Sequence, residues 1–442
     1  MNLKITTVML CAAFSMSVLA VPEIREGSVA MVQDASRKVT ITYTLDAAPA
    51  VVTVDILTNG VPLTGEMLQG RLTGAINCKV EPGIHTISWR PRADDRIVKE
   101  RDWAENAKAV VTAWPTNAPP TWMVVDLTKM NAVEFYPDES WFPEPMTSRV
   151  YKTDKLVMRK ISAANKIWTL GSYQYGSVGG KNYGEFGRSD NETARPVMLT
   201  DDYYIGVFEV TQAQYEHIKE LPAQSWTDDP TLPVGNVQWK QELRCTGNVH
   251  YFWPRDGHAV SDTSFMGILR ARTGNIQFDL PTEAQWEIAC RAGEGAAFNN
   301  GCMMHTNIVL VDEVAWVSNK NEVVRLHPVG LKKPNRWGLY DMHGNVSEYC
   351  LDLFPVKSPT GLSSAATQAH KAYFSNTDLI VDPVGPQDAS GGLTSGEERS
   401  IAKGGAFNLL SNYARSACRY NPQRWYAEQK EGFRLCCPAA IP

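Results

Sequence analysis

The stretch WGLYDMHGNVSEYC, residues 337–350, places four polar side chains within eight positions, between a Trp-Gly pair and a Tyr-Cys pair. The four are Asp341, His343, Asn345 and Glu348. A tight loop in which Asp341 and Glu348 bracket Gly344 can supply the carboxylate and carbonyl oxygens that Ca²⁺ prefers. The residues alone equally allow Asp341 to cap a turn while Glu348 pairs with an arginine. The stretch therefore indicates either a metal loop or a buried polar turn.

The composition narrows the class of protein. The chain has 442 residues, 43% of them hydrophobic, which is enough to bury cores in two or three domains. Thirteen Trp, 26 Pro and 32 Gly with only 21% charged residues favour a loop-rich fold over a helical bundle. The net charge of −5 gives no support to nucleic-acid binding.

The first 20 residues are typical of a secretory signal peptide. Lys4 precedes an apolar run from Ile5 to Leu19, and the small residues Val18 and Ala20 occupy the positions expected before a cleavage site. The run is too short for a membrane anchor, and no later segment has the length and apolarity of a membrane span. We therefore expect an exported protein, periplasmic or extracellular, whose eight remaining cysteines enter a compartment that permits disulfides.

Residues 21–130 read as short strands. Runs such as KVTITYTLD and AVVTVDILTNG are β-branched and are separated by turn residues, which predicts a small β-sandwich of immunoglobulin-like or fibronectin-like type with an accessory role. The segment 131–153, rich in Pro, Glu and aromatic residues, is predicted to be a linker. A second domain is expected over 154–438.

Two helices are well signalled in the second domain. TEAQWEIACRAG carries Thr282 as N-cap, Gln285 as its capping-box partner and Gly293 as terminator. TQAQYEHIKEL begins in the same way at Thr211. Loops separate the remaining short elements.

Several stretches of this domain occur in the order of one known family. They are WTLGS (168–172), RPVMLTDDYYIGVFEVTQAQY (195–215), PVGNVQW (233–239), LPTEAQWEIACRAG (280–293), HPVGLKKPNRWGLYDMHGNVSEYC (327–350), VDPVGPQ (381–387), KGGAF (403–407) and GFRL (432–435). Together they resemble the formylglycine-generating enzyme family, also called sulfatase-modifying factors, over roughly residues 154–438. The resemblance implies an α+β fold, a variant of the C-type-lectin fold with long loops.

The resemblance also bears on the opening stretch. It matches the side chains of Asp341 and Glu348 and the carbonyls of Gly344 and Val346 to a structural calcium site, in which His343 is a bystander. Ser347 and Tyr349 replace tryptophans that are usual in the family. The packing over the loop is therefore expected to differ, while the ligands remain.

The redox chemistry of the family is not expected here. Formylglycine-generating enzymes use a cysteine pair after the Gly-Gly motif, because thiolates are soft ligands suited to Cu(I). The corresponding segment, GGAFNLLSNYARSACRY, has no cysteine between Gly405 and Arg415; Leu409 stands at about the first cysteine's position, and Cys418 lies beyond the loop. We therefore expect no copper site.

Other residues offer weaker candidates. Cys302 and His305 have the spacing of one pair of zinc ligands, but the sequence offers no second pair. His327 is expected to have a structural role. His250 and His258 are expected to pack within a loop. Through the family resemblance, Cys290 is expected to form a disulfide to the C-terminal strands, which hold Cys418, Cys436 and Cys437.

Two functions remain open at this point. One is a non-catalytic binding scaffold for an unknown protein or small-molecule ligand, with sulfatase-like partners included. The other is an exported oxidase of the formylglycine-generating family, acting on a protein or a small molecule through a non-standard site.

Overall fold

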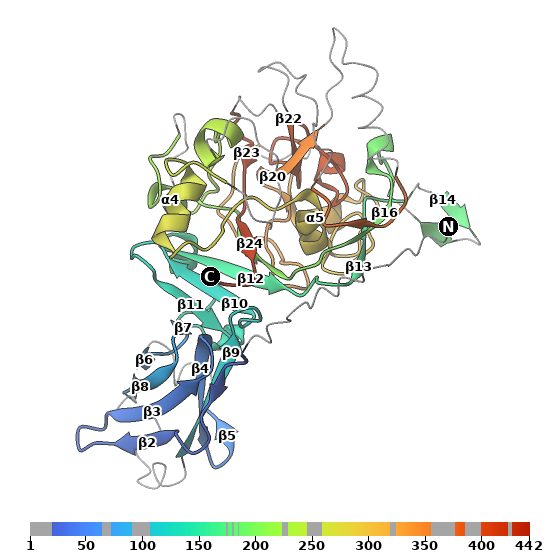
Figure 1. Ribbon diagram of the computed structural model, residues 1–442. Coiled ribbons are helices and arrows are strands. Elements are labelled where there is room, and N and C mark those ends of the chain that lie inside the picture. Colours follow the sequence, from blue (N-terminus) through green and yellow to red (C-terminus); the bar gives the residue numbers. More distant parts are fainter. Residues whose placement is uncertain are drawn as a thin grey trace, which may run out of the picture.

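The computed structural model describes twelve stretches of the chain and shows two units (Figure 1). The described residues are 20–63, 72–90, 107–173, 176–178, 181–183, 185–222, 229–244, 259–318, 324–354, 376–384, 399–422 and 427–442. Most of the predicted signal peptide, together with Cys245, His250 and His258, lies outside them. None of the helices in these stretches has the length and apolarity needed to cross a membrane.

The smaller, N-terminal unit consists of two antiparallel sheets, drawn in blue at the bottom of Figure 1. One contains β1 (Glu23–Ile24), β2 (Ala30–Gln33), β3 (Val39–Asp46), β6 (Leu72–Gly74) and β8 (Gly83–Trp89); the other contains β4 (Ala50–Thr58), β5 (Val61–Pro62), β7 (Lys79–Val80) and β9 (Ala107–Pro115). Side chains of both sheets share one hydrophobic core, which includes Ile41, Tyr43 and Val54. In β3, buried and half-buried side chains alternate, as the period of a strand with one face on a core requires.

The larger unit is built on a five-stranded sheet in the order β11-β10-β12-β17-β24. Its strands are β11 (Val133–Tyr136), β10 (Trp122–Asp126), β12 (Lys155–Ile161), β17 (Tyr203–Gly206) and β24 (Cys436–Pro438). Smaller sheets join β13 (Ile167–Leu170), β16 (Arg195–Met198) and β21 (Ile380–Val381), and β20 (Ser347–Phe354), β22 (Arg399–Lys403) and β23 (Glu431–Gly432). Two strand pairs complete the set: β14 (Gly176–Val178) with β15 (Lys181–Tyr183), and β18 (Ala315–Trp316) with β19 (His343–Gly344).

Helices are few and short in the described part of this unit. They are α3 (Gln212–Glu216), α4 (Phe265–Arg272), α5 (Glu283–Arg291) and α6 (Ile308–Asp312), with single turns η2 (Glu139–Trp141), η3 (Arg149–Lys152), η4 (Asp190–Glu192), η5 (Trp239–Arg244) and η6 (Ser411–Ala414). The predicted capping box of Thr282 with Gln285 starts α5, and the predicted helix start at Thr211 is confirmed, where a second capping box with Gln214 starts α3. The mixed α and β content agrees with the predicted α+β class.

The segment 131–153 is not the free linker that its composition suggested. Strand β11 pairs with β10, so this segment continues the sheet of the larger unit. All of its aromatic rings except that of Trp141, which is half-buried, are buried, with 5.1 Å between the ring centroids of Tyr136 and Phe142 and 5.6 Å between those of Phe142 and Tyr151. The Pro and Glu content obscured this apolar set, and the larger sheet begins at Trp122 rather than near residue 154.

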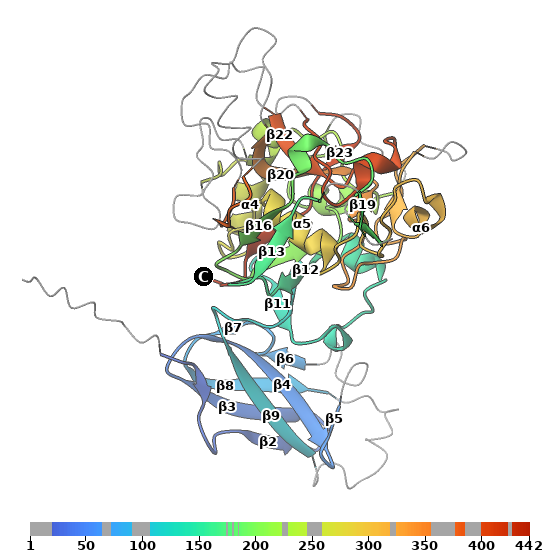
Figure 2. The same cartoon turned by 90° about the vertical axis from the view of Figure 1, so that its right-hand side faces the viewer.

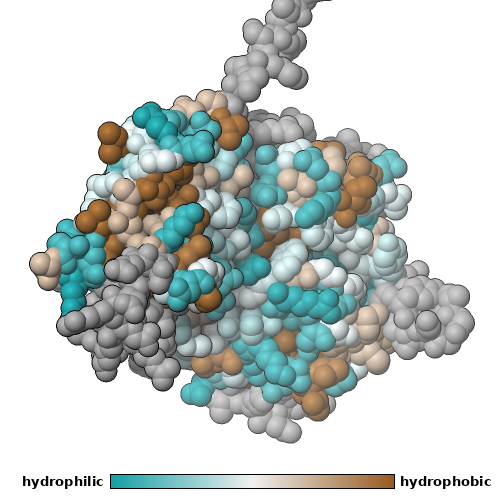
Figure 3. Space-filling view, turned by 90° about the horizontal axis from the view of Figure 1, so that it is seen from below, coloured by the Kyte–Doolittle hydropathy of each residue, from teal (hydrophilic) through white to brown (hydrophobic). Residues whose placement is uncertain are grey.

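The two units contact each other through backbone groups. Phe135 N–H donates to the Asn77 carbonyl (2.7 Å), and Ile441 N–H donates to the Thr116 carbonyl (3.0 Å). The turned view shows the smaller unit below the larger one (Figure 2), and on the face seen from below, hydrophobic and hydrophilic side chains mix in small groups (Figure 3).

Candidate functional site

A glycine pair shapes the loop that would carry the chemistry. Gly404 and Gly405 follow β22 with φ of +87° and +71°, a region that disfavours other residues. A Cβ on Gly405 would lie 2.9 Å from the backbone of Ala414, and one on Gly404 would lie 3.3 Å from the ring of Trp286. Only glycine therefore lets the loop close against η6 on one side and α5 on the other.

The loop itself contains no thiol. Leu409 is half-buried, its N–H donates to the Ala406 carbonyl (2.9 Å), and its carbonyl accepts from Ser318 N–H (2.8 Å). Asn408, Leu410 and Tyr413 are the exposed side chains of the loop. At about the position of the family's first cysteine, the chain therefore presents an aliphatic side chain.

The nearest thiols are buried. Cys418 lies beyond the loop, and burial raises the pKa of its thiol to about 11. Burial likewise raises the pKa of the Cys290 thiol to about 12. Neither group forms a thiolate readily at neutral pH.

The expected disulfide from Cys290 is not formed. All seven described cysteines are free thiols. The Cys290 Sγ faces the Ser416 Oγ at 3.5 Å and the His343 Nε2 at 3.7 Å, so a hydroxyl and an imidazole lie where the disulfide partner was expected.

His343 is not a bystander in this structure. Its ring is buried; Nε2 accepts from Asn299 N–H (3.1 Å), which leaves Nδ1–H to donate to the Ala414 carbonyl (2.6 Å). Burial lowers the pKa of the imidazole to about 4, so the ring is neutral. It ties the end of the Gly-Gly loop to the core.

The Glu348 carboxylate lies against an arginine. Oε2 accepts from Arg434 Nε at 2.5 Å and Oε1 from Arg434 Nη2 at 2.6 Å, and Trp286 Nε1 also donates to Oε2 (2.6 Å). All three side chains are fully buried. This is the ion pair that the residues alone allowed as an alternative to metal ligation.

Asp341 has a different environment. Its Oδ2 accepts from Gly330 N–H (2.6 Å), whereas Oδ1 is buried without a hydrogen-bond partner among the described residues. Burial raises the pKa of this carboxyl to about 6, and the nearby charge of Glu348 adds to the increase, although Arg434 and Lys152 oppose it. An orphaned carboxylate oxygen is a group that a cation would satisfy.

A third carboxylate, Glu209, belongs to this group and was missed from the sequence. It accepts from Val346 N–H (3.0 Å) and from the Asn345 side-chain amide (2.7 Å). Burial raises the pKa of Glu209 well above its usual value, and the charges of Asp341 and Glu348 raise it further. The available signal was its place between two apolar residues in VFEVTQ, where an acidic residue is seldom buried without a role.

These groups only partly fit a calcium ion. Asp341 offers a free oxygen, but both oxygens of Glu348 already accept from Arg434. Gly344 lies in β19 and Val346 directly before β20. Among the described residues no group of three or more His, Cys, Asp or Glu side chains is placed to hold a metal ion. The calcium site remains a prediction.

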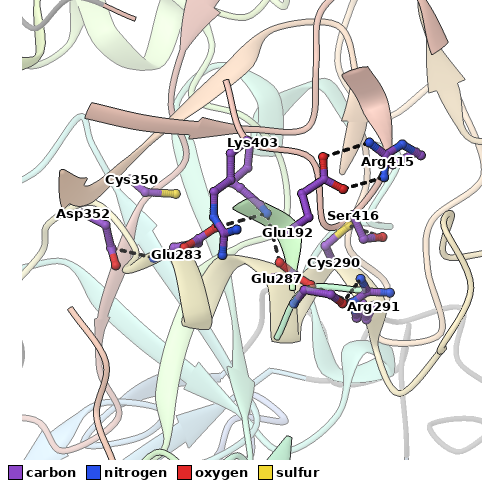
Figure 4. Close-up of polar contacts among 12 residues, drawn as sticks. Glu192, Glu283, Glu287, Cys290, Arg291, Cys350, Asp352, Lys403, Arg415 and Ser416 are labelled. Carbon is purple, nitrogen blue, oxygen red and sulfur yellow. Dashed lines mark hydrogen bonds and ion pairs between the residues drawn. The ribbon is translucent and has the colours of Figure 1, made fainter. Parts of the chain in front are cut away.

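A second buried cluster of charges surrounds α5 (Figure 4). Glu287 pairs with Lys403 (2.9 Å) and Arg291 (2.9 Å), and Glu283 pairs with Lys403 (3.4 Å) and Arg419. The pKa of Glu287 is lowered to about 2, because these cations outweigh the effect of burial. The cluster fastens α5 to the strand that leads into the Gly-Gly loop.

The remaining candidate residues, Cys302, His305 and His327, do not come together in one site. Cys302 Sγ donates to the Met304 carbonyl (3.2 Å), while the His305 ring stacks on Phe186 with 5.5 Å between ring centroids. His327 stacks on Trp316 with 3.6 Å between centroids. Each histidine therefore packs against an aromatic ring.

Two known proteins are similar in sequence to part of this chain. The chain is 26% identical over 198 residues to the chaperone protein LppX of Paenibacillus barcinonensis, covering 38% of this chain and 68% of that protein. It is 26% identical over 206 residues to the formylglycine-generating enzyme of Thermomonospora curvata, covering 45% of this chain. The match spans about half (52%) of that enzyme's length.

Solved structures are similar at low identity. PvdO from Pseudomonas aeruginosa matches with a TM-score of 0.43 and 17% identity, covering 64% of this chain and 94% of that one. Treponema denticola variable protein 1 matches with a TM-score of 0.39 and 23% identity, covering 64% of this chain and 95% of that one.

A family profile described as the sulfatase-modifying factor enzyme 1-like domain matches residues 160–438, which is more than half of the chain. The matched region contains the Gly-Gly loop, both buried charge clusters and the capped helix α5. The chain belongs to the sulfatase-modifying factor enzyme 1-like family.

Proposed function

We propose that this protein is an exported, non-catalytic binding scaffold, in which a C-type-lectin-like domain presents loops to a partner. The observation that carries the proposal is the loop after Gly405, where Leu409 stands in place of a thiol and no cysteine occurs before Arg415. Oxidation by copper-bound thiolates requires two soft sulfur ligands at this place.

The buried thiols do not replace the missing pair. Cys290 and Cys418 come close to the loop in sequence or in space, but burial raises the pKa of both. A thiol that stays protonated is a poor ligand for Cu(I) and a poor nucleophile. Copper is therefore not proposed as a cofactor.

The rest of the proposal concerns the whole chain. The leader in residues 1–20 supports export, and the two-sheet N-terminal unit supports an accessory β-sandwich of immunoglobulin-like or fibronectin-like type. One relative carries the name of a chaperone, which is in keeping with binding as the activity. The partner is proposed to be a protein or a small molecule, with sulfatase-like proteins among the candidates.

A peptide assay separates this proposal from the oxidase alternative. Purified protein is incubated with a Cys-x-Pro-x-Arg peptide, O₂ and Cu(I), and the peptide mass is measured. We expect no aldehyde product, with or without copper. Formation of the aldehyde by the wild type, and its loss in Cys418→Ser with Cys78→Ser as control, would establish the oxidase and refute the scaffold.

Calcium is proposed as a structural ion. Asp341 supports this, because its Oδ1 is buried and accepts no hydrogen bond in the described part of the chain. The predicted companions are the carbonyls of Gly344 and Val346 and the Glu348 carboxylate. Such an ion would supply positive charge to a cluster rich in carboxylates and would take no part in a reaction.

A further inference from the structure

Two segments of the larger unit contain no charged residue. Residues 295–311 and 404–414 together hold 28 positions without Asp, Glu, Lys or Arg, whereas about six would be expected at the chain's average of 21%. His305 is the one titratable imidazole among them. This depletion coincides with the position of the Gly-Gly loop.

The two segments lie against each other in the fold. Ser411 Oγ donates to the His305 carbonyl (2.9 Å), and Ser416 N–H donates to the Ala297 carbonyl (2.8 Å). Ala297, Val311 and Ala414 also belong to one hydrophobic cluster. The two segments are therefore packed against each other, and α6 lies at the outer edge of the larger unit (Figure 2).

Apolar side chains are exposed over this part of the surface. We call them the charge-free surface: Met304, Ile308, Val309, Leu310, Leu410 and Tyr413. Val309 is 78% exposed and Leu410 58% exposed. Scattered exposed apolar residues are ordinary, but a group drawn from two adjoining segments marks an interaction surface.

Two polar side chains of the first segment form hydrogen bonds within it. Asn300 Nδ2 donates to the Leu310 carbonyl (2.7 Å), and Asn307 Oδ1 caps the first turn of α6. Charges occur at the rim, where Lys332 pairs with Asp312 (2.8 Å) and Lys333 with Glu313 (3.2 Å). An apolar centre without charges and a rim of charges is the anatomy of a protein-binding surface.

We propose that the charge-free surface binds an uncharged, apolar segment of a polypeptide partner. A charged segment would lose hydration against these two segments, and neither 295–311 nor 404–414 offers it an opposite charge, so its binding would be costly. The inference rests on the proposed binding function and specifies its site and the chemistry of its partner.

The test uses a display library of random 12-residue peptides, selected on the immobilised full chain. Enriched peptides should lack charged residues at their centre. Val309→Asp and Leu410→Asp should each weaken the binding of synthetic copies by about tenfold or more, because each places a carboxylate in the contact. Ile84→Asp is the matched control: Ile84 is 81% exposed, lies on β8 of the N-terminal unit and should leave binding unchanged.

Several outcomes would overturn the proposal. One is that peptides are enriched no more on the wild type than on Val309→Asp. The others are that the enriched peptides are charged, or that Ile84→Asp weakens peptide binding as much as Val309→Asp does. Self-association abolished by Val309→Asp in sedimentation velocity would instead assign the surface to a second copy, and Val309-dependent binding to phosphatidylcholine vesicles would assign it to a membrane. Melting curves of the variants exclude misfolding. A chain that binds no peptide and forms no aldehyde refutes this inference and leaves the scaffold proposal standing.

Discussion

The two buried charge clusters of the larger unit have opposite electrostatics. Around α5, Glu287 has two cations within 2.9 Å, and its pKa falls to about 2. Around Arg434, the carboxyls of Glu209 and Asp341 have raised pKa values. All of these groups are buried.

The difference follows from the number of cations that each carboxylate meets. Burial penalises the charged form in both places, and only direct pairing reverses the penalty. Glu209 accepts from amide groups, and Arg434 directs its strongest contacts to Glu348. Glu287 is thus fully paired, whereas the carboxylates around Arg434 have room for another positive charge.

The largest expected effect comes from removing the arginine of the second cluster. Arg434→Met leaves Glu348 buried without its partner and frees the carbonyls of Gly206 and Tyr340, so we expect a loss of about 5 kcal/mol in the free energy of unfolding. Chemical denaturation measures it. Arg25→Met, which breaks the exposed pair with Asp46, is the control and should change little. A small loss at Arg434 would mean that Glu348 finds another partner.

A smaller loss is expected in the α5 cluster. Glu287→Gln keeps the shape but leaves Lys403 and Arg291 with one fewer negative charge, which should cost about 3 kcal/mol. Asp341→Asn, measured without calcium, should cost much less, because the amide can still accept from Gly330 N–H and the repulsion with Glu209 disappears. An equal loss in the free energy of unfolding for Glu287→Gln and Asp341→Asn would contradict the electrostatic difference between the two clusters.

A bound calcium ion would reduce the electrostatic difference between the two clusters, because it would supply positive charge to the carboxylates around Arg434. At 100 times its dissociation constant, an ion bound only to the native state adds about 2.7 kcal/mol, so EDTA should lower the melting temperature. Asp341→Asn should remove this response, whereas Asp34→Asn, at an exposed turn of the N-terminal unit, should retain it. Melting curves that do not respond to chelator in the wild type would exclude the site.

The smallest effect is in the pH dependence, measured in calcium-free buffer. The folded-state pKa of Asp341, about 6, lies above its ordinary value of 3.8, so its favourable contribution is present below pH 3.8 and is lost as the pH rises through 6. Glu287, with a folded pKa of about 2, contributes above its ordinary value of 4.5 and loses this as the pH falls toward 2. Asp341→Asn should therefore flatten the stability curve between pH 4 and 7. If the stability curve of Asp341→Asn matched that of the wild type, the charge of Asp341 would already be balanced in the folded protein.

Much of the local structure followed from short patterns. The capping box at Thr282 could be predicted because a cap depends on residues three positions apart, and the helix start at Thr211 is a local signal of the same kind. The strands of the N-terminal unit were readable for a similar reason, since alternation along β3 is a local property. The linker prediction failed because the pairing of β11 with β10 is not encoded in the composition of 131–153.

The candidate site was less predictable. Glu348 could be read as a metal ligand or as an ion-pair partner, and Arg434, 86 positions away, decided which contact forms in the structure. Glu209 lies 136 positions from Asn345 and was not connected with it. The neighbour of Cys290 was predicted as a cysteine, whereas the fold places Ser416 there.

By itself, the sequence determined the family, the absence of a cysteine between Gly405 and Arg415, and the starts of two helices, because these depend on residue identity and short spacing. Only the tertiary structure decided which buried charges are compensated, which thiols are shielded and where the two charge-free segments meet. The physical reason is that desolvation and ion pairing depend on groups brought together from distant positions, and the pKa values of Glu287 and Asp341 diverge on that account alone.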